Sequence, residues 1–149
     1  MNKIILKNLE LKTFIEQNAF DYCQINNINP DEITELYLYD NRLTDISGIR
    51  LFKNLEKLFL DYNQLTDISV LKYLTKLKML DIKSNKIKDI SVILNLKNLE
   101  YLNIRDLRLK SDQIQYIKSL KNLKELYCSK GFKDINILNK LNRNIKIYE

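Results

Sequence analysis

The chain has 149 residues, of which 45% are apolar and 30% charged, and it carries a formal net charge of +6 with an isoelectric point near 9.2. This length fits one domain with a continuous core, and two glycines and one proline leave little for a flexible linker. No apolar run is long enough to cross a bilayer, and the lack of histidine removes the most common general base and metal ligand.

The first 32 residues show no repeat, and we expect them to form an N-terminal cap. The apolar run at 4–6 ends at Lys7, which is too short for the core of a signal peptide. A cytoplasmic location is therefore expected, with a secreted form left open. Residues 13–16 (Thr-Phe-Ile-Glu) have the form of a helix capping box. The residues that then share one helical face are Ile15, Ala19, Tyr22 and Cys23.

From residue 33 onward, one phrase returns at a fixed step. The run 55–69 (LEKLFLDYNQLTDIS) recurs at 77–91 as LKMLDIKSNKIKDIS. The copies start 22 residues apart, at Ile33, Leu55, Leu77 and Leu99. A fixed period of this size indicates a solenoid, in which stacked coils share one core and offer a long concave surface.

The repeat becomes irregular toward the C-terminus. Leu107 takes the place of asparagine in the fourth copy, and the fifth copy starts at Leu123, 24 residues after the fourth. The two extra residues at 110–113 predict a longer helix, capped by Ser111 or Asp112.

The start and the irregular end of the repeat define the domain organisation. We predict a single domain with a cap at 1–32, about five repeats at 33–144 and a terminal stub strand at 145–149. That last strand would be an edge guarded only by charged neighbours, which predicts weak self-association through it.

Each copy predicts one strand and one helical return. Leu58 and Leu60 alternate with outward residues and so point inward from a strand. Parallel strands need a return path, and apolar residues three apart at 68, 71 and 74 suit a 3₁₀ or short α turn. We therefore predict an α/β right-handed solenoid with a parallel sheet on the concave face and 3₁₀ or short helical turns on the convex face.

Two polar series recur with the coils. Asn41, Asn63 and Asn85 hold the turn after the strand, where a buried amide can both donate to and accept from the backbone of two coils. Aspartates precede isoleucine at the start of the return and can accept from its free N–H groups. They are Asp45, Asp67, Asp89 and Asp134. Both series have a structural role, and carboxylates one coil apart do not predict a metal site.

The pattern L-x-x-L-x-L-x-x-N-x-L is the leucine-rich repeat signature. With Thr-Asp-Ile-Ser at 44–47 and 66–69, it resembles the 22-residue subclass of bacterial internalins and of the leucine-rich regulatory subunit of protein phosphatase 1. The resemblance covers about residues 33–141. It implies a horseshoe with a helical cap and is specific for the fold, whereas the subclass serves many unrelated binding roles. Internalins carry a secretory signal, whereas we expect none in this sequence.

The outward residues of the sheet are not dictated by the repeat, so they carry the functional prediction. Aromatic residues and arginine dominate binding hot spots. We predict a protein or peptide partner, of unknown identity, at Tyr37, Tyr39, Phe59, Tyr62, Met79, Tyr101, Arg105, Arg108 and Tyr127. Tyrosine also favours strands whatever its role, which is the simpler explanation of this series.

An alternative function is a basic binder of nucleic acid or an anionic surface. Cations beside stacking aromatics suit single strands. The residues would be Lys83, Lys86, Arg105, Arg108 and Lys130. We consider this less consistent with the sequence, because lysines are spread over the whole surface, and we expect no membrane partner.

No motif for catalysis is present. The sequence has no glycine-rich phosphate loop, no paired cysteines at metal spacing and no nucleophile elbow. Cys23 and Cys128 are about four strand steps of ~4.8 Å apart, too far for a disulfide. We therefore predict a non-enzymatic protein without cofactor or metal.

Overall fold

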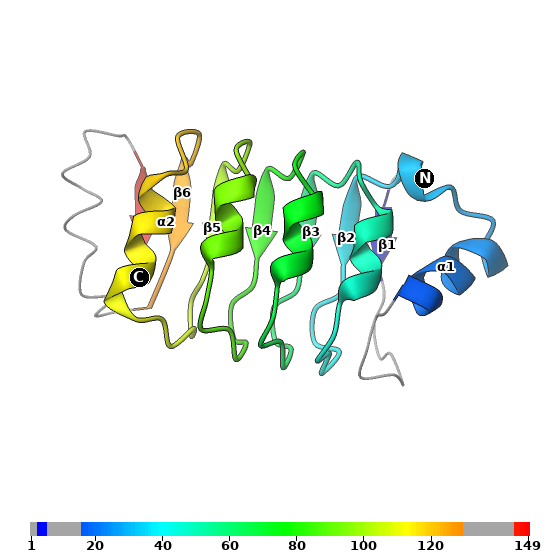
Figure 1. Ribbon diagram of the computed structural model, residues 1–149, viewed down its shortest axis with the longest axis horizontal. Coiled ribbons are helices and arrows are strands. Elements are labelled where there is room, and N and C mark those ends of the chain that lie inside the picture. Colours follow the sequence, from blue (N-terminus) through cyan, green and yellow to red (C-terminus); the bar gives the residue numbers. More distant parts are fainter. Residues whose placement is uncertain (1–2, 6–15, 130–144) are drawn as a thin grey trace.

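The computed structural model describes residues 3–5, 16–129 and 145–149. Within these residues, seven strands form one open parallel sheet in chain order (Figure 1). They are β1 (Lys3–Ile5), β2 (Glu35–Tyr37), β3 (Lys57–Phe59), β4 (Met79–Asp81), β5 (Tyr101–Asn103), β6 (Glu125–Tyr127) and β7 (Lys146–Tyr148). The register advances by one repeat at each step, so Leu36 pairs with Leu58 and Leu58 with Leu80.

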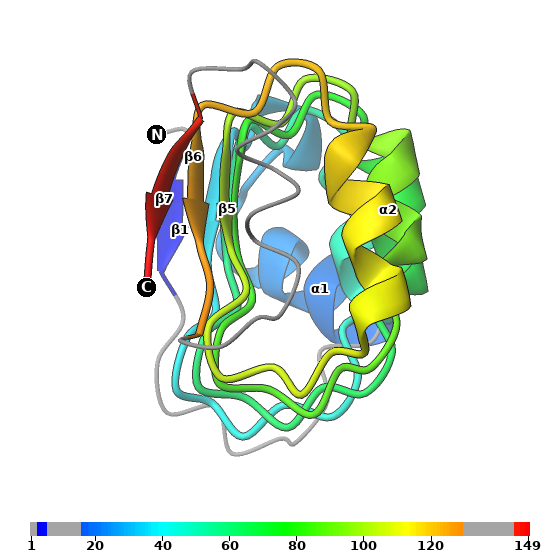
Figure 2. The same cartoon turned by 90° about the vertical axis from the view of Figure 1, so that its left-hand side faces the viewer.

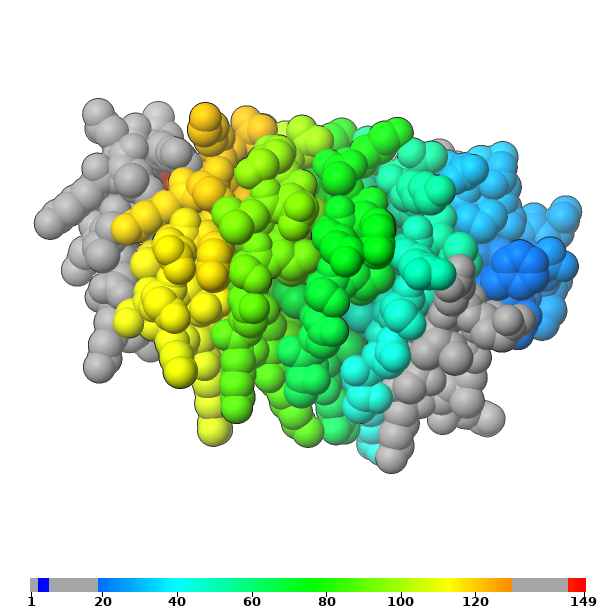
Figure 3. All heavy atoms as spheres, viewed as in Figure 1, coloured from blue at the N-terminus to red at the C-terminus, as the bar shows by residue number. Residues whose placement is uncertain are grey.

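The return segments form a second layer opposite the sheet, as Figure 2 shows. They are the 3₁₀ helices η2 (Ser47–Leu51), η3 (Ser69–Tyr73), η4 (Ser91–Asn95) and η5 (Ser111–Gln113), with the α-helix α2 (Ile114–Lys118) following η5. In Figure 3 the coils lie side by side as successive bands of colour. The predicted solenoid with a parallel sheet and short helical returns is therefore confirmed.

The core lies between the two layers. The predicted inward residues Leu58 and Leu60 are fully buried, and so are Leu71 and Leu74 from the return segment that faces them. The aspartates fix the start of each return: Asp67 Oδ1 accepts from the Ser69 N–H at 2.7 Å, and Asp89 repeats this contact with Ser91 at 2.8 Å. Asp134 lies outside the described residues.

The N-terminal cap is helical, as predicted. Helix α1 (Glu16–Ile25) packs against η2, buries Ala19 and Cys23, and is followed by a 3₁₀ turn, η1 (Pro30–Glu32). The side chains of the proposed capping box at residues 13–16, Ile15 among them, lie outside those that the structure describes. Strand β1 was not predicted: Lys3–Ile5 pairs with β2 and forms the first strand of the sheet.

The return segment of the fourth repeat, η5 with α2, is helical as predicted but lacks the predicted side-chain cap. A helix follows the insertion, but neither Ser111 nor Asp112 caps it with a side-chain hydrogen bond. Gln113 is buried instead, and its Oε1 accepts from the Ile90 N–H of the preceding coil at 2.9 Å. The insertion therefore extends contacts between coils.

Both cysteines are free and buried. Burial raises the pKa of the Cys128 thiol to about 11 and also raises the pKa of Cys23. Because the thiolate is the reactive form, both side chains act as small apolar residues.

Candidate interaction surface

The solvent side of the sheet, called the concave face below, consists of parallel rows set by the strand register. One row runs through the first residue of each strand: Lys3, Glu35, Lys57, Met79, Tyr101, Glu125 and Lys146. The central row runs through the third: Ile5, Tyr37, Phe59, Asp81, Asn103, Tyr127 and Tyr148. Residues two positions beyond the central row add a further row to the concave face, among them Tyr39, Asp61, Lys83 and Arg105.

An aromatic pair occupies the N-terminal part of this face. The rings of Tyr37 and Phe59 stack with centroids 4.6 Å apart, and the Lys3 ammonium lies 4.3 Å from the centre of the Tyr37 ring. Glu35 accepts from Lys57 Nζ at 2.8 Å and from the Tyr37 hydroxyl at 3.0 Å. The hydrogen bond from Lys57 lowers the pKa of Glu35, so the carboxylate stays charged beside the two rings. Both rings are half-buried and remain open to a partner.

The centre of the face is polar and covered. Asp81 and Asn103 stand in the central row, at positions that the two-residue alternation of a strand turns outward, but only 6% and 4% of their surfaces are exposed. The Asp81 carboxylate accepts from Asn103 Nδ2 at 2.8 Å and from the Lys83 N–H at 3.1 Å. Burial raises the pKa of Asp81 despite these bonds. These two short side chains therefore bond to each other and to the backbone just beyond their own strands instead of facing solvent.

A second aromatic group occupies the C-terminal part. Tyr127 stacks on Tyr148 at 4.4 Å and lies 5.0 Å from Tyr101, with the Arg105 guanidinium 5.0 Å from the centre of its ring. Burial, with the Asp81 charge nearby, raises the pKa of Tyr101 to about 12. The prediction omitted Tyr148. The alternation of a strand could have identified it: if Ile147 points inward, its neighbours Lys146 and Tyr148 point outward.

The remaining predicted residues lie at different places. Met79 and Tyr39 are half-buried on the concave face, whereas Tyr62 stands at its rim, 55% exposed, with a positive φ of 55°. The Lys83 ammonium lies 5.0 Å from the centre of the Tyr62 ring and 4.0 Å from Asp61. Arg108 is exposed on the following loop, away from both aromatic groups.

Of the cations in the basic alternative, Lys83 and Arg105 thus pack on tyrosine rings, and Lys86 donates to Gln64 Oε1 at 3.2 Å. Lys130 lies outside the described residues.

The asparagines join neighbouring coils below this surface. Asn63 Oδ1 accepts from the N–H groups of Asn41 and Leu43 at 3.1 and 2.8 Å. Its Nδ2 donates to the carbonyls of Leu38 and Leu60 at 2.8 and 2.9 Å. One coil later, Asn85 Oδ1 accepts from the Leu65 N–H at 3.0 Å, and its Nδ2 donates to the carbonyls of Leu60 and Ile82 at 2.9 and 3.0 Å. These contacts hold the strands, and hence the outward side chains, in register.

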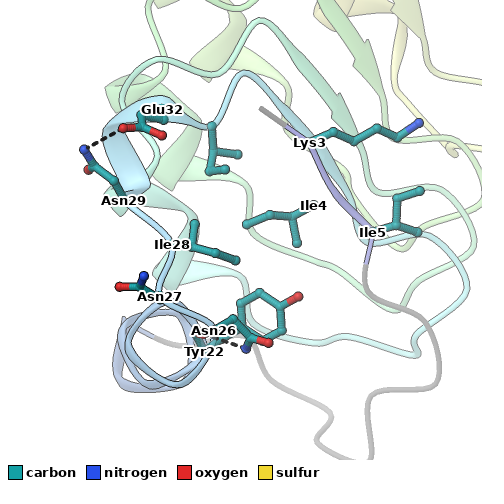
Figure 4. A pocket seen from close by; sticks show the side chains of 10 residues that line it. Lys3, Ile4, Ile5, Tyr22, Asn26, Asn27, Ile28, Asn29 and Glu32 are labelled. Carbon is teal, nitrogen blue, oxygen red and sulfur yellow. Dashed lines mark hydrogen bonds between the residues drawn. The ribbon is translucent and has the colours of Figure 1, made fainter. Parts of the chain in front are cut away.

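A cavity of about 750 Å³ lies at the N-terminal end (Figure 4). Ile4 and Ile28 point toward each other across it, and Tyr22 lies beside them. This lining is largely apolar and brings no catalytic group together. Within the described ranges, no three acidic or sulfur side chains converge as metal ligands, and no helix is long and apolar enough to span a membrane.

Comparison with known families identifies the repeat. A family model described as "Leucine Rich repeats (2 copies)" matches residues 31–73, and one described as "Leucine rich repeat" matches residues 53–109. No curated protein is a significant sequence match.

Solved structures agree with this assignment. An internalin (inlF) from Listeria monocytogenes is 34% identical with a TM-score of 0.73, over 80% of this chain and 35% of that one. Internalin C2 from the same organism is 32% identical with a TM-score of 0.62, over 66% of this chain and 42% of that one. A leucine-rich repeat protein of Leptospira interrogans shares the fold at 22% identity and a TM-score of 0.67, over 100% of this chain and 49% of that one.

This chain therefore spans between about a third and a half of the length of each of these structures. The repeat spacing, the open parallel sheet and these matches agree: the chain is a leucine-rich repeat protein that resembles the internalins.

Proposed function

We propose that this chain binds a protein or peptide partner on its concave face and does so without catalysing a reaction. Leucine-rich repeat proteins are in general non-enzymatic interaction scaffolds. The observation that carries the proposal is the placement of two aromatic groups on the solvent side of the sheet, Tyr37 with Phe59 and Tyr101 with Tyr127 and Tyr148.

Aromatic rings bury much surface at little conformational cost, and stacking already restricts these rings before a partner arrives. The polar centre at Asp81 and Asn103 has its hydrogen bonds satisfied within the chain. A partner with two apolar anchors, one for each aromatic group, would fit this arrangement.

Charge along the face would set the direction of docking. Asp40 and Asp61 lie toward its N-terminal half, and Lys83 and Arg105 toward its C-terminal half. A partner with the opposite order of charges would bind in one orientation, since complementary charges steer association and fix register.

Affinity capture from a lysate of the source cells, followed by mass spectrometry, tests the proposal. We expect Phe59→Ala and Tyr127→Ala each to weaken capture of the same partner on the order of tenfold or more. Tyr73→Ala is the matched control, because this tyrosine is 50% exposed on the convex return η3. Loss of capture with Tyr73→Ala but not with the two concave-face variants would refute the proposal.

A further inference from the structure

A second cavity, of about 590 Å³, opens between the loop that follows β4 and the loop that follows β5. These loops lie at the edge toward which the strand arrows point in Figure 1. Residues 85–88, with Asp106 and Arg108, make up most of the lining, and Thr66 from the loop after β3 completes it. It is therefore separate from the concave-face aromatic groups.

The cavity lies where the asparagine series is interrupted. Leu43 N–H donates to Asn63 Oδ1 at 2.8 Å, and one coil later Leu65 N–H donates to Asn85 Oδ1 at 3.0 Å. The next donor in this series is Ile87 N–H. Its acceptor would be a side-chain oxygen at position 107, but that residue is leucine, whose side chain has none.

A backbone contact is missing at the same step. Gln64 N–H donates to the Leu43 carbonyl and Lys86 N–H to the Leu65 carbonyl, both across coils. The corresponding bond, from Arg108 to Ile87, is absent from this described stretch.

Ile87 N–H likewise has no acceptor within the described part of the chain. Ile87 is only 1% exposed, and a buried N–H without a partner is costly. The fold therefore leaves a donor that lines a cavity and lacks its expected oxygen.

The cavity is also positively charged. Lys86, Lys88 and Arg108 line it against one carboxylate, Asp106. Asp106 accepts from the Ser84 hydroxyl at 2.9 Å, and Lys86 donates to the neutral Gln64. Within residues 3–5, 16–129 and 145–149, neither Lys88 nor Arg108 forms an ion pair.

We propose that this cavity binds an oxyanion, a phosphate or carboxylate group, whose oxygen takes the place of the missing asparagine oxygen at Ile87 N–H. Arg108 would hold further oxygens of the same group, because a guanidinium donates two parallel bonds to such anions. Lys86 and Lys88 would add charge. This site does not depend on partner binding at the concave face, so either proposal can fail alone.

Amide NMR of the whole chain at constant ionic strength tests the site, with inorganic phosphate and sodium acetate as separate probes. We expect a saturable shift that is largest at Ile87 N–H. Saturation with phosphate assigns the site to phosphoryl groups, and saturation with acetate alone assigns it to carboxylates.

Two variants make the test specific. Leu107→Asn would supply the missing oxygen, as Asn63 and Asn85 do, and should abolish the saturable shift. Hydrogen exchange shows separately whether the new asparagine forms the intended bond, because Ile87 N–H should then exchange with solvent more slowly than in the unmodified chain. Arg108→Ala should weaken anion binding about tenfold through the lost charge-assisted bonds.

Lys97→Ala is the matched control, since it removes one positive charge from an exposed loop away from the cavity lining. It should leave binding unchanged. Absence of a saturable shift with both probes would overturn the proposal. An equal loss of affinity in Arg108→Ala and Lys97→Ala would also overturn it, because binding would then follow net charge alone.

Discussion

Asn63 joins two coils through one side chain that bonds the N–H groups of Asn41 and Leu43 and the carbonyls of Leu38 and Leu60. Asn63→Ala leaves these buried groups short of partners. We expect it to lower the free energy of unfolding by about 3 kcal/mol, measured by urea denaturation.

The control for this variant is Asn95→Ala. Asn95 is exposed and makes one bond, to the Val92 carbonyl of its own turn. Its loss should cost less than about 1 kcal/mol. Equal effects of the two variants would show that the bonds between coils do not matter to stability.

Asp81 should make stability depend on pH in an unusual direction. Because burial raises its pKa, the folded chain binds this proton more tightly than the unfolded chain does. The ionised carboxylate therefore lowers the free energy of unfolding at neutral pH. That penalty is relieved as pH falls through the raised folded pKa toward the ordinary range of aspartate.

Comparison with Asp81→Asn isolates this effect, because the variant cannot ionise at this position and all other titrating groups are shared. We expect the free energy of unfolding of the variant, relative to the unmodified chain, to be higher at neutral pH than at about pH 4. Urea denaturation at the two pH values measures it. A difference that does not change with pH, or that grows in acid, contradicts the raised pKa.

At the level of elements, strand β1 contains two adjacent isoleucines with very different exposure to solvent. Ile4 is buried with 3% of its surface exposed, whereas Ile5 is 49% exposed on the other side of the strand. Ile4→Ala should lower the free energy of unfolding by about 2–4 kcal/mol, and Ile5→Ala by less than about 1 kcal/mol. Thermal and urea unfolding measure both. If the two cost the same, β1 is not part of the sheet.

The repeated strands could be predicted because each copy corroborates the others. Leu36, Leu58 and Leu80 recur at one step, and the parallel register follows from that step. Strand β1 could not be predicted in this way, because Lys3–Ile5 has no periodic continuation in the residues that follow it. Helix α2 was expected from its insertion, but its lack of a side-chain cap was not, since Gln113 serves the preceding coil instead.

At the level of the whole molecule, the repeat predicted which strand residues of successive coils pair in one row, but not how their side chains cover one another. Tyr37 and Phe59 could be placed side by side from register alone. The burial of Asp81 and Asn103 could not, because it depends on the size and rotamers of side chains in adjacent coils. The cavity at Ile87 likewise arises from a departure in the repeat, Leu107, whose consequence appears only when the coils are stacked.

The central claim, that a partner covers the concave face, can be measured directly by hydroxyl-radical footprinting of the complex, which reports the solvent access of individual tyrosine and phenylalanine side chains. We predict that a bound partner protects Tyr37, Phe59, Tyr127 and Tyr148 from oxidation and leaves Tyr73 on the convex return unchanged. Protection of Tyr73, with the four concave-face rings oxidised as in the free chain, would contradict it.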